Sequence, residues 1–141
     1  MSQKADSESE CNPDLPADNP AVATVQRQLD AYNAKALDVL VSIYADDAQL
    51  FEHPATLLAS GTTQLRERFA ARFQEPNLHA QLRNRMVLGD KVVDHELVTR
   101  TFPEGLGTIE LIMIYEVANG KIAKAWSIAG TKTLQPDSPA A

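Results

Sequence analysis

The second half of the chain alternates between apolar and polar residues with a period of two, and this pattern constrains the fold more than any other feature. Such alternation predicts β-strands. Four strands are expected, over residues 78–88, 92–102, 108–117 and 121–131. Turn sequences separate them, and the last of these, Asn119-Gly120, favours a two-residue turn with positive φ at both positions. The pattern therefore predicts an antiparallel meander of four strands.

The first half of the chain has helical spacing instead. Asn19 can cap a helix, and Pro20 suits the first helical position. Apolar residues at helical spacing predict three helices, over residues 20–34, about 37–46 and about 63–75. A short strand is expected between the second and third helices, over residues 48–52, and it ends before His53-Pro54 because the residue before proline avoids helix. Helices followed by a meander predict an α+β fold with the helices on one face of the sheet.

The ends of the chain differ in composition from its middle. Residues 1–18 lack periodicity and are rich in Ser, Asp and Glu, which predicts a disordered acidic arm. Residues 132–141 contain two prolines and are expected to form a flexible tail. One domain is therefore expected over residues 19–131.

Charge and cysteine content exclude several classes of partner. The net charge is −6, and most of it lies in the first twenty residues, so the domain has no strong field to attract nucleic acid or a membrane surface. No apolar run is long enough to span a membrane, and the first residues lack an apolar leader. The single cysteine, Cys11, favours a reducing compartment, so a cytoplasmic protein is expected. A cluster of arginines is interpreted as solvated helix and strand faces: Arg66, Arg68, Arg72, Arg83 and Arg85.

The last two predicted strands are apolar on both faces. One face of residues 109–117 carries Met113 and Tyr115 among other apolar side chains, and residues 121–131 carry Ile122 on the same face as Trp126. Strands of this kind need cover on both faces, whereas three helices can cover only one. We therefore expect a homodimer through the outer face of the sheet. The apolar residues of that face are Ile112, Ile114, Trp126 and Ile128.

Short motifs are spread over the whole predicted domain. They are Val25-Gln26-Arg27, Tyr44-Ala45-Asp46-Asp47-Ala48, Ser60-Gly61, and Asn119-Gly120-Lys121-Ile122 followed by Trp126 and Gly130. Together they resemble the nuclear transport factor 2-like superfamily, which includes ketosteroid isomerase, limonene-epoxide hydrolase, scytalone dehydratase and the SnoaL-like polyketide cyclases. Two further runs, Phe51-Glu52-His53-Pro54 and Val93-Asp94-His95-Glu96, are interpreted as marks of an uncharacterised bacterial subgroup of SnoaL-like, ketosteroid isomerase-like proteins. The resemblance implies a cystatin-like curved sheet wrapped on the three helices, forming a cone with an apolar pocket.

The resemblance also implies positions for catalytic residues. Ketosteroid isomerase uses a carboxylate base and an oxyanion hole made of a tyrosine and a protonated aspartate. Aligned on the Val-Gln-Arg motif, the tyrosine position falls on Gln28, with Tyr32 one turn later, and the protonated aspartate falls on Met113. The base position falls on His53 or, one residue earlier, on Glu52. By this comparison a base is present and the oxyanion hole is not.

By the same resemblance, Glu96, Val98 and Arg100 point into the cone. Charged groups in such a place must pair or take part in chemistry. Arg100 is expected to reach Glu52 or an anion of a ligand, an arrangement similar to the carboxylates and arginine of limonene-epoxide hydrolase. The other interpretation of Glu96, and of Asp94 beside it, is that both are solvated.

Two functions are compatible with this sequence. The first is acid–base chemistry of the isomerase, cyclase or dehydratase type on an apolar substrate, in which His53 or Glu52 moves a proton and Arg100 stabilises negative charge. The second is a ligand-binding or dimerisation module without catalysis. No cofactor is expected, and no metal, because the three histidines lack the spacing of metal ligands. The expected substrate contacts are Gln28, Tyr32, Glu96, Val98, Met113, Tyr115 and Trp126.

Overall fold

The computed structural model describes residues 19–136. In chain order the elements are α1 Pro20–Asn33, α2 Leu37–Ile43, β2 Tyr44–Glu52, β3 Thr56–Ser60, α3 Gly61–Arg72, β4 His79–Leu88, β5 Lys91–Phe102, β6 Gly105–Ala118 and β7 Lys121–Leu134. The expected acidic arm at residues 1–18, with Cys11, lies outside the described residues, and so do residues 137–141 of the expected tail.

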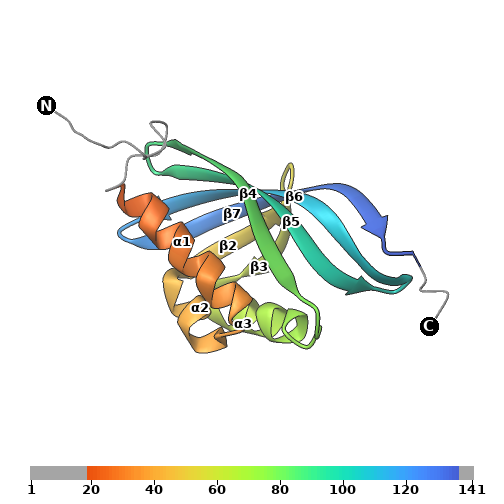
Figure 1. Ribbon diagram of the computed structural model, residues 1–141. Helices are drawn as coiled ribbons and strands as arrows, with labels where there is room; N and C mark the ends of the chain where they lie inside the picture. The colour runs from red at the N-terminus through yellow and green to blue at the C-terminus, as the bar shows by residue number, and fades with distance from the viewer. Residues whose placement is uncertain (1–18, 137–141) are drawn as a thin grey trace, which may run out of the picture.

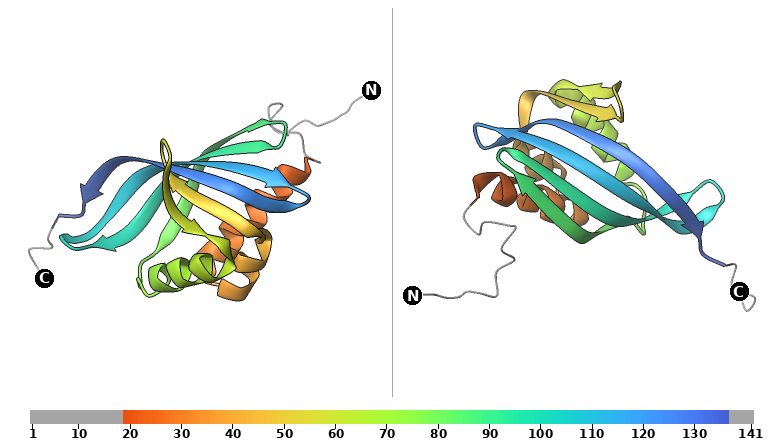
Figure 2. Two further views of the ribbon diagram at one scale, coloured as in Figure 1. Left: turned by 180° about the vertical axis from the view of Figure 1, so that it is seen from behind. Right: turned by 90° about the horizontal axis from the view of Figure 1, so that it is seen from above.

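The strands form one six-stranded sheet in the order β3-β2-β7-β6-β5-β4. Neighbouring strands are antiparallel, except that β2 runs parallel to β7. The sheet is curved, and the three helices lie against one of its faces (Figures 1 and 2). The expected α+β fold with helices on one side of an antiparallel meander is confirmed.

Helix α1 begins and ends as its sequence requires. The Asn19 side chain accepts hydrogen bonds from the backbone amides of Ala21 (2.7 Å) and Val22 (3.3 Å), which caps the first turn. At the other end, the Asn33 side chain donates to the Ala80 carbonyl (2.9 Å) and accepts from the Ala80 amide (2.8 Å). The amide of Asn33 thus ties the end of α1 to β4 and places the helix across the sheet (Figure 1).

Several elements differ from the prediction; α3, for example, begins at Gly61 and ends at Arg72, and β6 begins at Gly105. Helix α2 ends at Ile43, because Tyr44 starts β2 and pairs with the distant Ile122 of β7. Strand β3 is not predicted, since only Ala59 of its five residues is buried and its burial gives no alternating pattern. Strand β7 continues past residue 131 to Leu134, opposite Gly107. A Cβ at Gly107 would lie 2.5 Å from the Thr133 carbonyl oxygen, so the close approach of these strand ends requires glycine there.

An irregularity in the β6–β7 register changes which side chains share a face. Val117 pairs with Ile122, whereas Glu116 pairs with Lys124, so one extra residue enters β7. Ile122 is therefore fully buried under the helices, and its expected position on the outer face is wrong. The four residues expected on the outer face remain together there, because Ile112 pairs with Ile128 and Ile114 pairs with Trp126.

Candidate functional site

A cavity of about 320 Å³ lies between the helices and the sheet. Side chains of α1, α3 and all six strands line it, and most of its wall is apolar. Its volume falls at the lower end of the range of roughly 300–1,000 Å³ that is typical of small-molecule sites. The cavity is therefore large enough for a small ligand.

Most of the predicted site residues line this cavity. They are Gln28, Tyr32, Glu52, Glu96, Val98, Arg100, Met113 and Tyr115. The two exceptions are His53, whose side chain is exposed at the turn after β2, and Trp126, which pairs with Ile114 and stacks on Phe51 with ring centroids 5.7 Å apart. Successive side chains of a strand point to opposite faces, which explains why Glu52, at the end of β2, lines the cavity whereas the next residue, His53, does not. Glu52 lines the cavity, where it is exposed to solvent.

One end of the cavity is a buried polar cluster. The Tyr115 hydroxyl donates to Gln28 Oε1 (3.2 Å), and Gln28 Nε2 donates to the Tyr44 hydroxyl oxygen (3.3 Å). Burial raises the pKa of both tyrosines, so both are neutral at physiological pH. Tyr44 was not among the predicted site residues, although it belongs to one of the motifs quoted above. Among residues 19–136, no side chain or carbonyl accepts the Tyr44 hydroxyl proton, so that donor is available to a ligand.

Glu96 lies at the same buried end of the cavity. Its side chain is on the inner face of β5, and the residue is only 4% exposed. Burial, followed by the charge of Asp94, raises the pKa of Glu96 to about 8, although the charge of Arg85 opposes this shift. No hydrogen bond to its carboxyl group comes from any of the described residues. Glu96 is therefore a neutral carboxylic acid at pH 7, and the alternative interpretation of a solvated Glu96 is wrong.

A buried ion pair supports this end of the cavity. Arg85 binds Asp94 with two hydrogen bonds, Nε to Oδ1 (2.6 Å) and Nη2 to Oδ2 (2.9 Å), and its Nη1 donates to Gln26 Oε1 (2.8 Å). The two charged side chains are 5% and 1% exposed, so the expected solvated positions of Arg85 and Asp94 are wrong. An irregularity in β4 between Leu82 and Asn84 turns Arg85 to the inner face, which simple alternation could not predict.

The opposite end of the cavity is positively charged, and we call it the mouth. It is lined by Arg68 and Arg72 of α3, by Arg100 of β5, and by the exposed carboxylate of Glu52. The two arginines of α3 were predicted to lie on a solvated face. They are four residues apart and therefore share one side of the helix, and that side borders the cavity.

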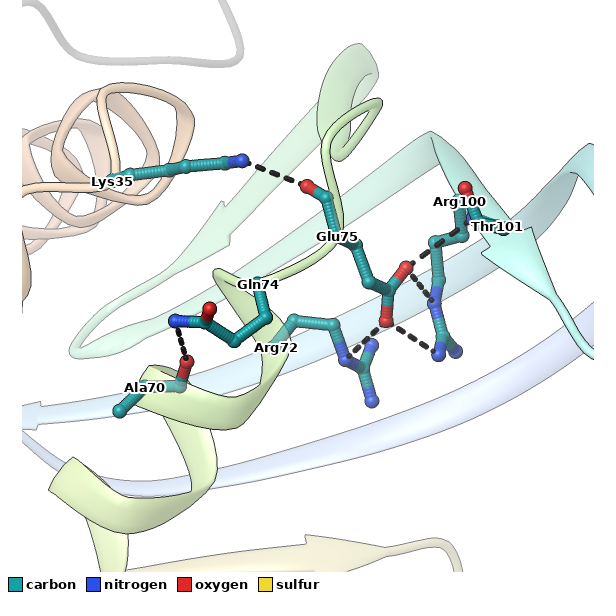
Figure 3. Close-up of polar contacts among 7 residues, drawn as sticks. All are labelled: Lys35, Ala70, Arg72, Gln74, Glu75, Arg100 and Thr101. Atoms are coloured by element: carbon teal, nitrogen blue, oxygen red, sulfur yellow. Dashed lines mark hydrogen bonds and ion pairs between the residues drawn. The ribbon is translucent and has the colours of Figure 1, made fainter.

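Arg100 is paired with Glu75, which lies in the turn after α3 (Figure 3). Arg100 Nε and Nη2 donate to the two oxygens of Glu75 (3.2 and 2.9 Å), and Arg72 Nε lies 3.4 Å from Glu75 Oε2. Partial burial raises the pKa of Glu75, but the hydrogen bond and charge of Arg100 outweigh it and hold that pKa below its ordinary value. The expectation that Arg100 reaches Glu52 is therefore wrong. The ammonium of Lys35 also binds this turn, donating to the Glu75 carbonyl (2.7 Å).

The SnoaL-like domain matches residues 25–125. The chain belongs to the SnoaL-like domain family. No curated protein matches the sequence of this SnoaL-like chain. Its resemblance to the nuclear transport factor 2-like superfamily, and to SnoaL-like proteins of unknown function in particular, is confirmed.

Solved structures show the same fold. An uncharacterised cystatin-fold protein from Novosphingobium aromaticivorans is 26% identical, with a TM-score of 0.71 over 77% of this chain and 97% of that one. A protein from Jannaschia, provisionally described as a SnoaL-like polyketide cyclase, is 20% identical (TM-score 0.70, 84% and 91% covered). An epoxide hydrolase from M. tuberculosis that resembles limonene-epoxide hydrolase is 14% identical (TM-score 0.68, 82% and 86% covered). At these identities, the last two similarities concern the fold alone.

The chemistry of this SnoaL-like site comes from the side chains described above. Within residues 19–136, no group of three His, Cys, Asp or Glu side chains is placed to hold a metal ion. No helix in the same range is long and apolar enough to cross a membrane. The cavity instead offers a neutral carboxylic acid and a tyrosine hydroxyl at its buried end, and an exposed carboxylate and three guanidinium groups at its mouth.

Proposed function

We propose that this SnoaL-like chain is an enzyme that performs acid–base chemistry on an apolar small molecule held in the cavity. The observation that carries the proposal is Glu96, a buried carboxyl group with a pKa raised to about 8 and no hydrogen-bond partner among the described residues. A carboxyl group that is neutral at pH 7 can donate a hydrogen bond or a proton to a substrate oxygen. Glu96 is therefore the general acid of the proposal.

The other carboxyl group of the cavity supplies the base. Glu52 is exposed at the mouth, whereas Glu96 is buried, and two carboxyl groups in such different environments are suited to opposite roles. Glu52 takes the place of His53, whose side chain does not line the cavity. The free donor of Tyr44 supports the same substrate oxygen as Glu96, since both lie at the buried end. Isomerisation, cyclisation and dehydration share this step, in which an oxygen accepts a hydrogen bond while a base removes a proton from carbon.

The fold comparisons support this class of chemistry at a coarse level. One structural neighbour is named an epoxide hydrolase, and another is provisionally named a polyketide cyclase. A fold of this kind hosts many functions, so the assignment depends on the side chains of this cavity rather than on the neighbours.

A binding module without turnover is the second candidate. The engagement of Arg100 with Glu75 favours it, because Arg100 was expected to stabilise negative charge on a substrate. The two candidates differ in one measurable respect, which is whether a bound ketone exchanges its α-protons faster than in buffer.

The test uses 2-tetralone, an apolar bicyclic ketone, in D2O. Proton NMR follows the replacement of its α-protons by deuterium in the presence of the wild-type chain, Glu96→Gln, Glu52→Gln and His53→Gln. We expect the wild type to accelerate exchange, each carboxyl variant to lose about a hundredfold of that acceleration, and His53→Gln to retain it. Broadening of the ketone signals without faster exchange would support the binding module instead.

A further inference from the structure

We propose that the natural substrate carries a carboxylate, which Arg68 binds at the mouth of the cavity beside Arg72. This inference rests on the proposed function in one respect, which is that the cavity is the substrate site. It adds the chemical class of the substrate, an apolar body with an anionic end.

The first observation is the balance of charge at the mouth. Three guanidinium groups, those of Arg68, Arg72 and Arg100, line the cavity with a single charged carboxylate, Glu52. A second carboxylate, Glu75, lies beside the cavity and pairs with Arg72 and Arg100. Among the groups that line the cavity, cations exceed anions even with Glu75 counted, because Glu96 is neutral and Glu67 borders only the groove outside. An anionic group of a ligand would complete the balance.

The second observation is that Arg68 has no partner of its own. Within residues 19–136 it makes neither an ion pair nor a side-chain hydrogen bond, whereas its neighbour Arg66 binds Asp38 at 2.7 Å. Partial burial, followed by the charges of Arg72 and Arg100, lowers the pKa of the Arg68 guanidinium, and Tyr32 and Glu52 only partly oppose this. A cation that is crowded by two other cations gains from a bound anion.

The third observation is how this cluster already holds a carboxylate. Arg100 binds both oxygens of Glu75, and Arg72 approaches one of them through Nε (Figure 3). Two-point binding of this kind is the strongest way in which arginine recognises a carboxylate. Since Glu75 engages both Arg100 and Arg72, Arg68 is the guanidinium group of the mouth that remains for a ligand.

The position of the two α3 arginines suits this role. Arg68 and Arg72 also line a shallower groove on the outside of the cavity, together with Glu67 and Glu75. They therefore lie between the apolar interior and the surface. A carboxylate bound there keeps part of its hydration while the apolar part of the ligand is buried, which avoids the large cost of burying a charge fully.

The experiment compares two ligands of nearly the same shape that differ in charge, 2-naphthoate and 2-naphthamide. Each displaces the neutral fluorescent probe N-phenyl-1-naphthylamine from the cavity, which yields a dissociation constant for each ligand. We expect the wild type to bind 2-naphthoate about tenfold more tightly than 2-naphthamide, as charge-assisted hydrogen bonds predict. Arg68→Gln should bring this ratio close to one, and Arg68→Lys should retain part of the preference.

Arg66→Gln is the matched control, since Arg66 lies on the same helix and does not line the cavity. It should keep the wild-type ratio, and circular dichroism checks that every variant folds. A ratio near one in the wild type, or a ratio unchanged in Arg68→Gln, overturns the inference while leaving the exchange of 2-tetralone untouched. Failure of the neutral probe to bind at all removes the cavity as a ligand site, and the proposed function falls with it.

Discussion

Replacement of Glu96 by glutamine is the most informative perturbation of this protein. Glutamine keeps the size of the side chain and cannot ionise. Burial and the charge of Asp94 raise the pKa of Glu96 from 4.5 to about 8 in the folded chain. A carboxyl group whose folded pKa is raised stabilises the fold most at low pH, and that stability is lost as the pH rises from about 4.5 to about 8. The glutamine variant does not show this loss.

The size of the effect follows from the shift in pKa. One pKa unit corresponds to about 1.4 kcal/mol, and at pH 7 the unfolded wild type has released the Glu96 proton while the folded chain has kept it. This difference destabilises the folded wild type by about 3 kcal/mol at pH 7 and by about 1 kcal/mol at pH 5. We therefore expect Glu96→Gln to gain about 2 kcal/mol relative to the wild type between these two pH values. Other groups that titrate in this pH range do so in both proteins, so their contributions cancel when the two free energies of unfolding are subtracted.

Urea unfolding at pH 5, 6, 7 and 8, followed by the fluorescence of the single tryptophan, Trp126, measures this difference. The dependence of the unfolding free energy on urea concentration should be the same for both proteins, so that the midpoints are comparable. A difference between wild type and variant that stays constant over this pH range refutes the reasoning. Glu96 would then be ionised in the folded chain, and it could not act as the general acid.

Two further changes test the buried ion pair and the outer face of the sheet. Asp94→Asn leaves the guanidinium of Arg85 buried without a carboxylate, so the free energy of unfolding should fall by about 3 kcal/mol or more in urea denaturation, and an unchanged value contradicts the buried pair. Trp126→Glu places a charge beside Ile114 on the face that we expect to join two subunits, so light scattering after size exclusion should detect a dimer for the wild type and a monomer for the variant. A wild-type monomer at micromolar concentration contradicts the expected homodimer.

The elements that could be predicted from sequence are those with one buried face. Helix α1 carries Asn19 as its cap, and strand β5 alternates in burial as its sequence does. Strand β3 has no such alternation, because only one of its five residues, Ala59, is buried. The end of α2 depends on the pairing of Tyr44 with Ile122 of β7, and a local pattern cannot report a contact that remote.

The cavity could be predicted only where strand alternation is regular. Glu96 and Val98 line it because β5 runs without interruption opposite β6. Arg85 was assigned to the surface and is buried, since the irregularity in β4 exchanges the two faces, and no residue type in the sequence marks that position. Charged residues of a helix are solvated as a rule, so nothing in the sequence singled out Arg68 as a lining residue.

The two ends of the cavity constrain how a substrate can lie. At the buried end, Arg85 and Asp94 neutralise each other, and Glu96 keeps its proton because a second negative charge beside Asp94 is unfavourable. A carboxylate of the substrate is disfavoured there for the same reason, whereas a neutral carbonyl or hydroxyl oxygen can accept the proton of Glu96. At the mouth the preference is reversed, because Arg68 lacks an anion among the described residues. If both proposals hold, the reacting oxygen and the carboxylate are therefore at opposite ends of the substrate.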